Sequence, residues 1–148
     1  MDNYQHVLLA ADFSEHGSVV ALKAQHLAKQ HQAKLSIIHL LDNLPITDTT
    51  YGPIIPFDMD LNDLLMTSAK KQLAELGKTL GIPEQQQYLE IGSAALEIVS
   101  TAEENKVDLI VLGSHGRHGL ALLLGSTANG VLHHAQCDVL AVRLQVTN

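Results

Sequence analysis

The fold of this chain is decided by residues 107–126, which read VDLIVLGSHGRHGLALLLGS. The first six of these, Val107 to Leu112, form an apolar run that is typical of a strand buried on both faces. The segment after it carries glycines at positions 113, 116, 119 and 125. Residues 127–135 then read as a helix. Because glycines let a backbone approach a ligand closely and helix N-termini carry partial positive charge, this order of elements can bind a phosphate group.

The same stretch also has a simpler interpretation, in which the glycines only allow turns in a flexible connector. Ser126 likewise has two interpretations, as the N-cap of the helix or as a hydroxyl that binds an anion. Arg117, one of the two arginines of the chain, adds a positive charge to the loop. The pattern of this stretch alone leaves these alternatives open.

The composition favours one globular domain. The chain has 148 residues, of which 46% are hydrophobic, so it has the length of a single domain (residues 1–148) and can bury a substantial core. Aromatic residues make up only 3%, which predicts an aliphatic core and disfavours stacking on single-stranded nucleic acid. The net charge of −7 opposes general binding to nucleic acid or to anionic membranes.

Cysteine usage and hydropathy indicate the compartment. The single cysteine, Cys137, excludes an internal disulfide and fits a reducing environment. The first residues lack the basic segment and apolar core of a signal peptide. No apolar run approaches the roughly 18 residues that span a membrane. We therefore expect a cytoplasmic protein that has no membrane or nucleic-acid partner.

The rest of the chain alternates between strand-like and helix-like patterns. Strands joined by helices of this length are parallel and have right-handed crossovers, so the predicted sheet is covered by helices on both faces. The segment 44–58 shows no periodicity and is predicted to be irregular. The predicted strands are residues 6–11, 34–41, 86–91 (at a sheet edge), 107–112 and 137–144; the predicted helices follow Ser14 or lie at 59–80, 93–102 and 126–135.

In sheets of this kind ligands bind at the carboxyl ends of the strands, where the winding reverses. Asp12 stands at the end of the first predicted strand, and Gly113 opens the loop after the fourth. These two positions form one site only if the first and fourth strands are neighbours. Strand patterns alone do not decide that adjacency.

Several motifs in order resemble the universal stress protein family, and together they cover nearly the whole chain. They are Val7 to Ser14, the strand end Ile38-His39-Leu40, the run Val107 to Gly116, and Gly125-Ser126. The resemblance implies an α/β fold: a three-layer, Rossmann-like sandwich of the adenine nucleotide alpha hydrolase type, with a five-stranded parallel sheet in the order 3-2-1-4-5. It also implies a homodimer paired through the last strand, for which residues 139–144 are the candidate, because their apolar edge would otherwise be open to aggregation. A loop or the charged Arg143 at that edge is the alternative.

Some members of this family bind ATP, and these resemble the pattern G-x2-G-x9-G-[S/T]. Gly113 and Gly116 match its start, and Gly125-Ser126 match its end. The intervening residues 117–124 number eight, one fewer than in the family pattern. The shorter loop either leaves the phosphate contacts intact or draws the helix start away from the phosphates.

The resemblance also implies a role for each matching residue in an ATP site. Asp12 would lie near the ribose or base, although it can equally cap its own helix; Ala10 and Ala11 would form the adjacent wall, and the Leu40 backbone would meet the adenine edge. Leu112 and Gly113 would lie below the ribose and phosphates, and Mg²⁺ would be held by the phosphates themselves. The residues expected to turn an N–H group toward phosphate are Gly116, Gly125, Ser126 and Thr127.

Other chemistries have weaker support. His115 and His118, and likewise His133 and His134, are not joined by a cysteine or carboxylate in a metal-ligand pattern, so no metal site is predicted. His39, at a strand end, is interpreted as a hydrogen-bonded structural residue, and Cys137 as half-buried and inert.

Catalysis has little support in the sequence. Ser126 has no evident base and no Walker lysine follows a glycine, so we predict no catalytic residues and at most slow ATP hydrolysis. The leading hypothesis is a dimeric stress-response protein that binds ATP or another adenine nucleotide. The rivals are an interaction module of the same family without a ligand and, last, a slow ATPase or autophosphorylating enzyme.

Overall fold

The computed structural model describes residues 3–13, 17–41, 56–114 and 125–144. Within them, five parallel strands form one sheet in the order β3-β2-β1-β4-β5. The strands are β1 (His6–Ala10), β2 (Lys34–Leu41), β3 (Gln87–Ile91), β4 (Leu109–Gly113) and β5 (Asp138–Val142). The helices are α1 (Gly17–His31), α2 (Pro56–Leu80), α3 (Ala94–Glu104) and α4 (Ser126–His134). A short 3₁₀ turn, η3 (Glu84–Gln86), precedes β3. The predicted strand order is confirmed, and β3 is an edge strand as predicted.

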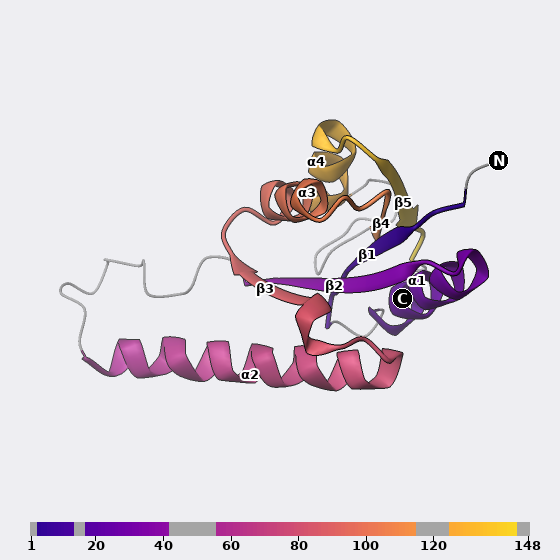
Figure 1. Ribbon diagram of the computed structural model, residues 1–148. Coiled ribbons are helices and arrows are strands. Elements are labelled where there is room, and N and C mark those ends of the chain that lie inside the picture. Colours follow the sequence, from indigo (N-terminus) through magenta and orange to yellow (C-terminus); the bar gives the residue numbers. More distant parts are fainter. Residues whose placement is uncertain (1–2, 14–16, 42–55, 115–124, 145–148) are drawn as a thin grey trace.

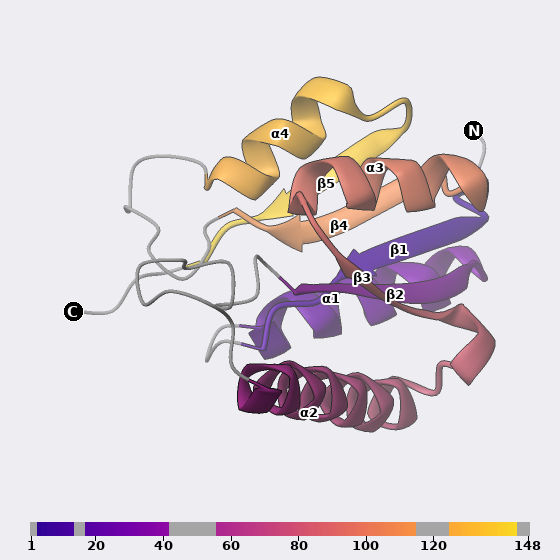
Figure 2. The same ribbon diagram turned by 90° about the vertical axis from the view of Figure 1, so that its left-hand side faces the viewer.

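The sheet is the middle layer of three (Figure 1). Helices α1 and α2 cover one face and α3 and α4 cover the other, and both views show the same division (Figures 1 and 2). The alternating residues of β1 separate accordingly: Val7 and Leu9 pack in the cluster on the α1–α2 side, whereas Leu8 packs in the cluster on the α3–α4 side. Both clusters are aliphatic, as the composition predicts.

Several boundaries differ from the predicted ones. Helix α2 begins at Pro56 rather than at residue 59, so it includes the last three residues of the segment 44–58 that was predicted to be irregular; the rest of that segment lies outside the described residues. Proline is well tolerated in the first turn of a helix, because its missing N–H has no intrahelical acceptor there. The last two strands are also shorter than predicted: β4 begins at Leu109 and β5 spans Asp138–Val142. The predicted stop of α2 is confirmed, since Gly81 has a left-handed φ of 73°.

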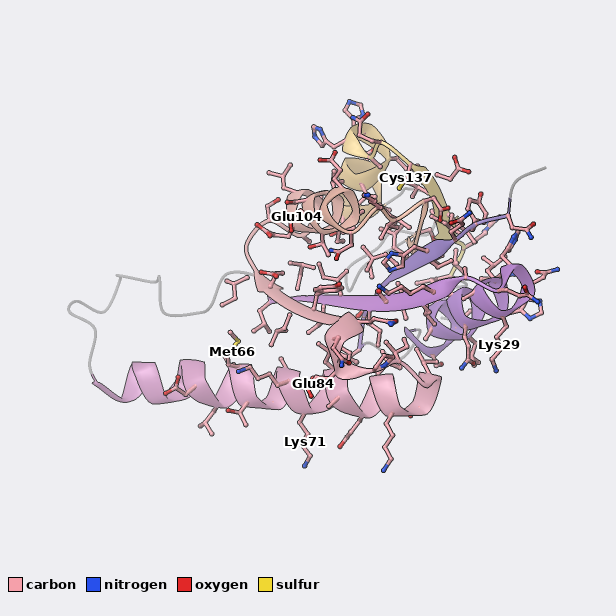
Figure 3. The ribbon with its side chains drawn as sticks, viewed as in Figure 1. Lys29, Met66, Lys71, Glu84, Glu104 and Cys137 are labelled. Carbon is pink, nitrogen blue, oxygen red and sulfur yellow. The ribbon has the colours of Figure 1, made fainter. Side chains whose placement is uncertain are left out.

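Helix faces match their sequence patterns. In α1 the buried residues are small or branched, namely Val20, Ala21, Ala24 and Ala28. On α2 the half-buried Met66 points toward the sheet, whereas the exposed Lys71 points into solvent (Figure 3). Helices α3 and α4 approach closely enough that a Cβ added to Gly130 would lie 2.6 Å from the Cβ of Ala95. Among the described helices, none is long and apolar enough to cross a membrane.

Candidate functional site

The carboxyl ends of β1 and β4 lie side by side, so the condition for a single site is met. The two strands pair in parallel, with Val7 opposite Leu109 and Leu9 opposite Val111. The ends of all the strands and the beginning of α4 face the same side, on the left of Figure 2. The end of the sheet where Asp12 and Gly113 stand is therefore also the end at which α4 starts.

An apolar wall forms on the α3–α4 face at this end of the sheet. The side chains of Ala10 and Leu40 pack against the same cluster that contains the buried Leu112. Ala128, in the first turn of α4, is 1% exposed and belongs to this cluster as well. The structure thus places three of the predicted residues in or against one cluster, to which the first turn of α4 also contributes.

Ala11 contributes differently from Ala10. Its side chain packs on the opposite, α1–α2 side, so only its main chain borders the apolar wall. The N–H of Ala11 donates to the Ile38 carbonyl at 2.8 Å, and its own carbonyl lies 3.3 Å from Nδ1 of His39. The His39 ring also makes an edge contact with Phe13 at a centroid distance of 4.5 Å. The interpretation of His39 as a hydrogen-bonded structural residue is confirmed.

Asp12 follows this fixed main chain and is half-buried. Its carbonyl oxygen lies against the first residue of α1, because a Cβ added to Gly17 would come within 1.7 Å of that oxygen. A side chain at position 17 therefore cannot be accommodated without moving the backbone of Asp12. Gly17 is a positioning residue that strand and helix patterns do not reveal; its glycine identity was the available signal.

The two residues that flank the segment 115–124 are hydrogen-bonded to each other. The N–H of Gly125 donates to the carbonyl of Ser114 at 2.7 Å. Ser114 is itself 5% exposed, its N–H donates to the Val142 carbonyl at 2.8 Å, and its Oγ lies 3.3 Å from the N–H of Leu144. Ser114, which the sequence interpretation did not select, therefore fixes the beginning of α4 to the sheet.

The structure corrects one expectation about the helix start, because the N-cap of α4 is Gly125 and not Ser126. The N–H of Gly125 donates to the Ser114 carbonyl, which holds α4 in place. That Gly125 also faces a phosphate stays a prediction. Ser126 is the exposed first residue of the helix.

The first turn of α4 is suited to a negative charge. The first intrahelical hydrogen bond at this end runs from the Asn129 N–H to the Gly125 carbonyl at 3.0 Å, so the N–H groups of Ser126, Thr127 and Ala128 have no acceptor within the helix. The turn contains no acidic residue. The partial positive charge of the helix end is thus not neutralised by its own side chains.

Some predicted residues lie outside the described part of the chain. They are Gly116, Arg117, His115, His118 and Ser14. Among the described residues, no three side chains of His, Cys, Asp or Glu gather closely enough to hold a metal ion.

Among the residues that the structure describes, three titratable groups have shifted pKa values, and these three lie toward the amino ends of the strands, away from this site. Burial lowers the pKa of His6, outweighing a hydrogen bond to the Asn105 carbonyl. The hydroxyl of Tyr4 donates a hydrogen bond of 2.7 Å to Asp138, and this bond raises the pKa of Tyr4. Burial raises the pKa of Cys137, aided by the nearby Asp138.

Comparison with known proteins gives consistent results. The model of the universal stress protein family matches residues 3–143. Universal stress protein A homolog 2 of Coxiella burnetii (strain RSA 493 / Nine Mile phase I) is 40% identical over 146 residues, which cover 98% of this chain and 99% of the relative.

Solved structures share the fold. Hypothetical protein MJ0577 superimposes with a TM-score of 0.80 at 25% identity, covering 98% of this chain and 99% of its own. A universal stress protein solved in complex with cAMP has a TM-score of 0.62 at 24% identity, covering 95% of this chain and 98% of its own.

Proposed function

Since the chain belongs to the universal stress protein family, we propose that it binds ATP or another adenine nucleotide at the carboxyl end of its sheet and acts as a homodimer. The phosphates would lie at the N-terminus of α4, with the nucleoside against the apolar wall of Ala10, Leu40 and Leu112. Mg²⁺ would accompany the phosphates. Cytoplasmic location stays a prediction.

The observation that carries this proposal is the uncapped start of α4. The N–H groups of Ser126 and Thr127 precede the first intrahelical bond, and the Ser126 hydroxyl is exposed beside them. Phosphate binds well to such a helix end, because the N–H groups and the helix dipole both favour negative charge. The hydrogen bond between Gly125 and Ser114 fixes this helix end above the apolar wall before any ligand arrives, which lowers the entropic cost of binding.

A site formed by the start of α4 and an apolar wall can bind a nucleotide, but it has few groups that could catalyse a reaction. Of the predicted site residues that the structure describes, Asp12 alone has an ionisable side chain. A hydrolase needs a positioned base and a group that stabilises the leaving phosphate. We therefore assign the protein a binding role, in which nucleotide occupancy is read by a partner, and slow hydrolysis remains the least supported alternative. The protein of the same fold solved with cAMP supports an adenine nucleotide as the ligand class.

The dimer would form along β5. This strand pairs with β4 on one side only, and Val139, Leu140 and Ala141 are half-buried. Unpaired strand edges readily pair with another chain. The second copy of this chain supplies a matching edge.

The proposal is tested by calorimetric titration of the purified protein with Mg-ATP, beside mass spectrometry of small molecules that it releases. The informative variant is Ser126→Asp, because a carboxylate in the first turn repels phosphate but stabilises the helix, by about 0.3–1 kcal/mol. We expect the variant to lose ATP binding while its unfolding temperature stays the same or rises. Ser100→Asp, at an exposed position on α3, is the matched control and should bind normally.

Two results would reject the nucleotide proposal. One is the absence of binding at millimolar ATP together with no nucleotide in the purified protein, which would favour the interaction module without a ligand. The other is unchanged affinity in Ser126→Asp, which would mean that the phosphates do not contact α4.

A further inference from the structure

A cavity of about 250 Å³ opens at the opposite end of the sheet from the candidate nucleotide site. It lies between the C-terminal part of α3, the beginning of β4 and the connection from α4 to β5. Figure 3 shows Cys137 in that connection, between the end of α4 and the beginning of β5. Neither the nucleotide site nor the open edge of β5 uses this cavity.

The cavity has an apolar floor and a charged rim. Its floor is formed by side chains that are at most 7% exposed, namely Val99, Ala102, Val107 and Ile110. Glu103 and Lys106 are exposed and stand at its rim. A small molecule bound here would therefore bury an apolar body and turn a polar end outward between a carboxylate and an ammonium group.

The wall on the α3 side is rigid, so the cavity is preformed. The Asn105 carbonyl accepts a hydrogen bond from Nδ1 of His6 at 3.0 Å, and its side chain bonds to Tyr88 Oη at 3.1 Å and to the Thr101 carbonyl at 2.8 Å. The next turn is closed by the Val107 N–H, which donates to the Ala102 carbonyl at 2.9 Å. Contacts from two strands and from α3 itself thus hold the segment that carries Lys106. A preformed pocket loses little conformational entropy when a ligand enters.

Cys137 completes the apolar lining. It is half-buried, and because burial raises the pKa of its thiol, it is neutral at physiological pH. A neutral thiol behaves as a small hydrophobic group. It presents sulfur, rather than an anion, to the interior.

From this cavity we infer that the protein binds a small neutral molecule with an apolar body of about one substituted ring and a hydroxyl at one end. Aliphatic cavities of about 150 Å³ already bind benzene, so 250 Å³ accommodates a ring with a substituent. A hydroxyl both donates and accepts a hydrogen bond, which matches a rim that offers an acceptor, Glu103, a donor, Lys106, and the amide of Gln136, which does both. A carboxylate in the same position could accept from Lys106 but could not donate to Glu103, whose like charge would oppose it.

The chain provides its own reporter of occupancy, because Cys137 is the only cysteine. The probe is p-cresol, and the readout is the rate at which Cys137 of the full-length protein reacts with 5,5′-dithiobis(2-nitrobenzoate). At about ten times its dissociation constant the probe occupies roughly nine-tenths of the sites, so the reaction slows about tenfold if the bound form is protected. Benzoate at the same concentration should protect Cys137 less than p-cresol does, since its carboxylate cannot donate a hydrogen bond to Glu103 and carries the same sign of charge.

Matched variants localise the effect. Ala135→Phe fills the cavity from the α4 end and should abolish the protection, whereas Ala74→Phe, on the exposed face of α2, should behave as wild type. Thermal unfolding followed by circular dichroism establishes that each variant is folded. Where Ala135→Phe does not fold, Cys137→Leu narrows the cavity at a second lining position, and binding is then followed by saturation-transfer NMR of p-cresol.

Three outcomes overturn the inference. They are the absence of saturable protection by p-cresol in the wild type, equal protection by benzoate, and protection or NMR binding that persists in a folded cavity-filling variant. Loss of protection confined to the cavity variants supports it. Because ATP titration is measured separately, either proposal can fail without the other.

Discussion

The N–H of Gly125 donates to the carbonyl oxygen of Ser114 across 2.7 Å, so a hydrogen bond joins the two residues that flank the segment 115–124. Ser114 is tied in turn to Val142, through a 2.8 Å bond from its own N–H. The helix start is therefore tied to the sheet through Ser114. From this tie we expect that the loop, one residue shorter than the family pattern, leaves α4 in place for a phosphate.

A one-residue insertion tests this directly. Adding a glycine between Ala121 and Leu122 restores the nine residues of the family pattern. Because lengthening a loop by one residue changes its closure entropy very little, we expect ATP affinity to change by less than about twofold. Isothermal titration calorimetry measures it, and a gain of tenfold or more would mean that the length of the loop, rather than Ser114, governs the site.

Removing the hydrogen bond between Gly125 and Ser114 should lower the free energy of unfolding. Gly125 has a φ of −64°, which both alanine and proline adopt. Gly125→Pro deletes the N–H, whereas Gly125→Ala keeps it. We expect the proline variant to be less stable than the alanine variant by about 1 kcal/mol, the usual net value of one such bond. Urea unfolding of the two variants measures this difference, and equal stabilities would show that the bond contributes nothing.

His6 should make the stability depend on pH. Its side chain is 6% exposed, its Nδ1 donates to the Asn105 carbonyl, and its Nε2 lies 2.6 Å from the hydroxyl of the fully buried Ser36. Burial lowers its pKa below the ordinary 6.5, Lys34 acts in the same direction, and Asp108 opposes them. The unfolded chain therefore takes up the proton first as the pH falls.

The expected dependence of stability on pH follows from the lowered pKa of His6. The contribution of neutral His6 to stability is complete above pH 6.5, the ordinary pKa, and is lost as the pH falls from there toward the lowered native pKa. Urea unfolding at about pH 7.5 and about pH 5.5 should show a smaller pH-dependent loss in His6→Gln than in the wild type. His26→Gln, at an exposed position on α1, should keep the slope of the wild type. A wild-type slope in His6→Gln would contradict the assignment.

The open edge of β5 can be blocked at one main-chain group. The Val142 carbonyl accepts from Ser114, so Val142 turns its main-chain groups toward β4. Since these groups alternate along a strand, those of Ala141 point to the open edge. Ala141→Pro removes one outward N–H without touching the β4 ladder, and proline is tolerated at such edge positions.

We expect the wild-type protein to be a dimer and Ala141→Pro a folded monomer. Light scattering coupled to size-exclusion chromatography measures both masses, with Ala141→Val as the dimeric control. A dimer that survives the proline substitution would assign the interface to another surface.

The sequence predicted the architecture well because its signals were local. Apolar runs such as the one from Val107 to Leu112 lie between recognisable helix patterns, and such alternation allows few topologies. The family motifs then supplied the strand order, which the patterns alone left open. His39 was interpreted correctly because a polar ring at a buried strand end needs a hydrogen-bond partner.

The remaining features depend on distances between separate segments. In the sequence Ser114 looks like any other loop residue. Its importance is evident only from the hydrogen bonds that join it to Val142 and Gly125 in the structure. Gly17 gains its importance only from the carbonyl of Asp12 that lies against it. The cavity beside Cys137 is lined by two separate stretches of the chain, residues 99–110 and 135–137, so neither stretch alone could reveal it.

Strand β4 links the two proposed sites, since Ile110 forms the floor of the cavity and Gly113 ends the strand at the nucleotide side. Three residues of extended chain separate them, roughly 10 Å. If occupancy of one site shifts this strand, thermodynamic reciprocity requires each ligand to alter the affinity of the other by the same factor. This five-residue strand would then couple the cavity at one end of the sheet to the proposed nucleotide site at the other.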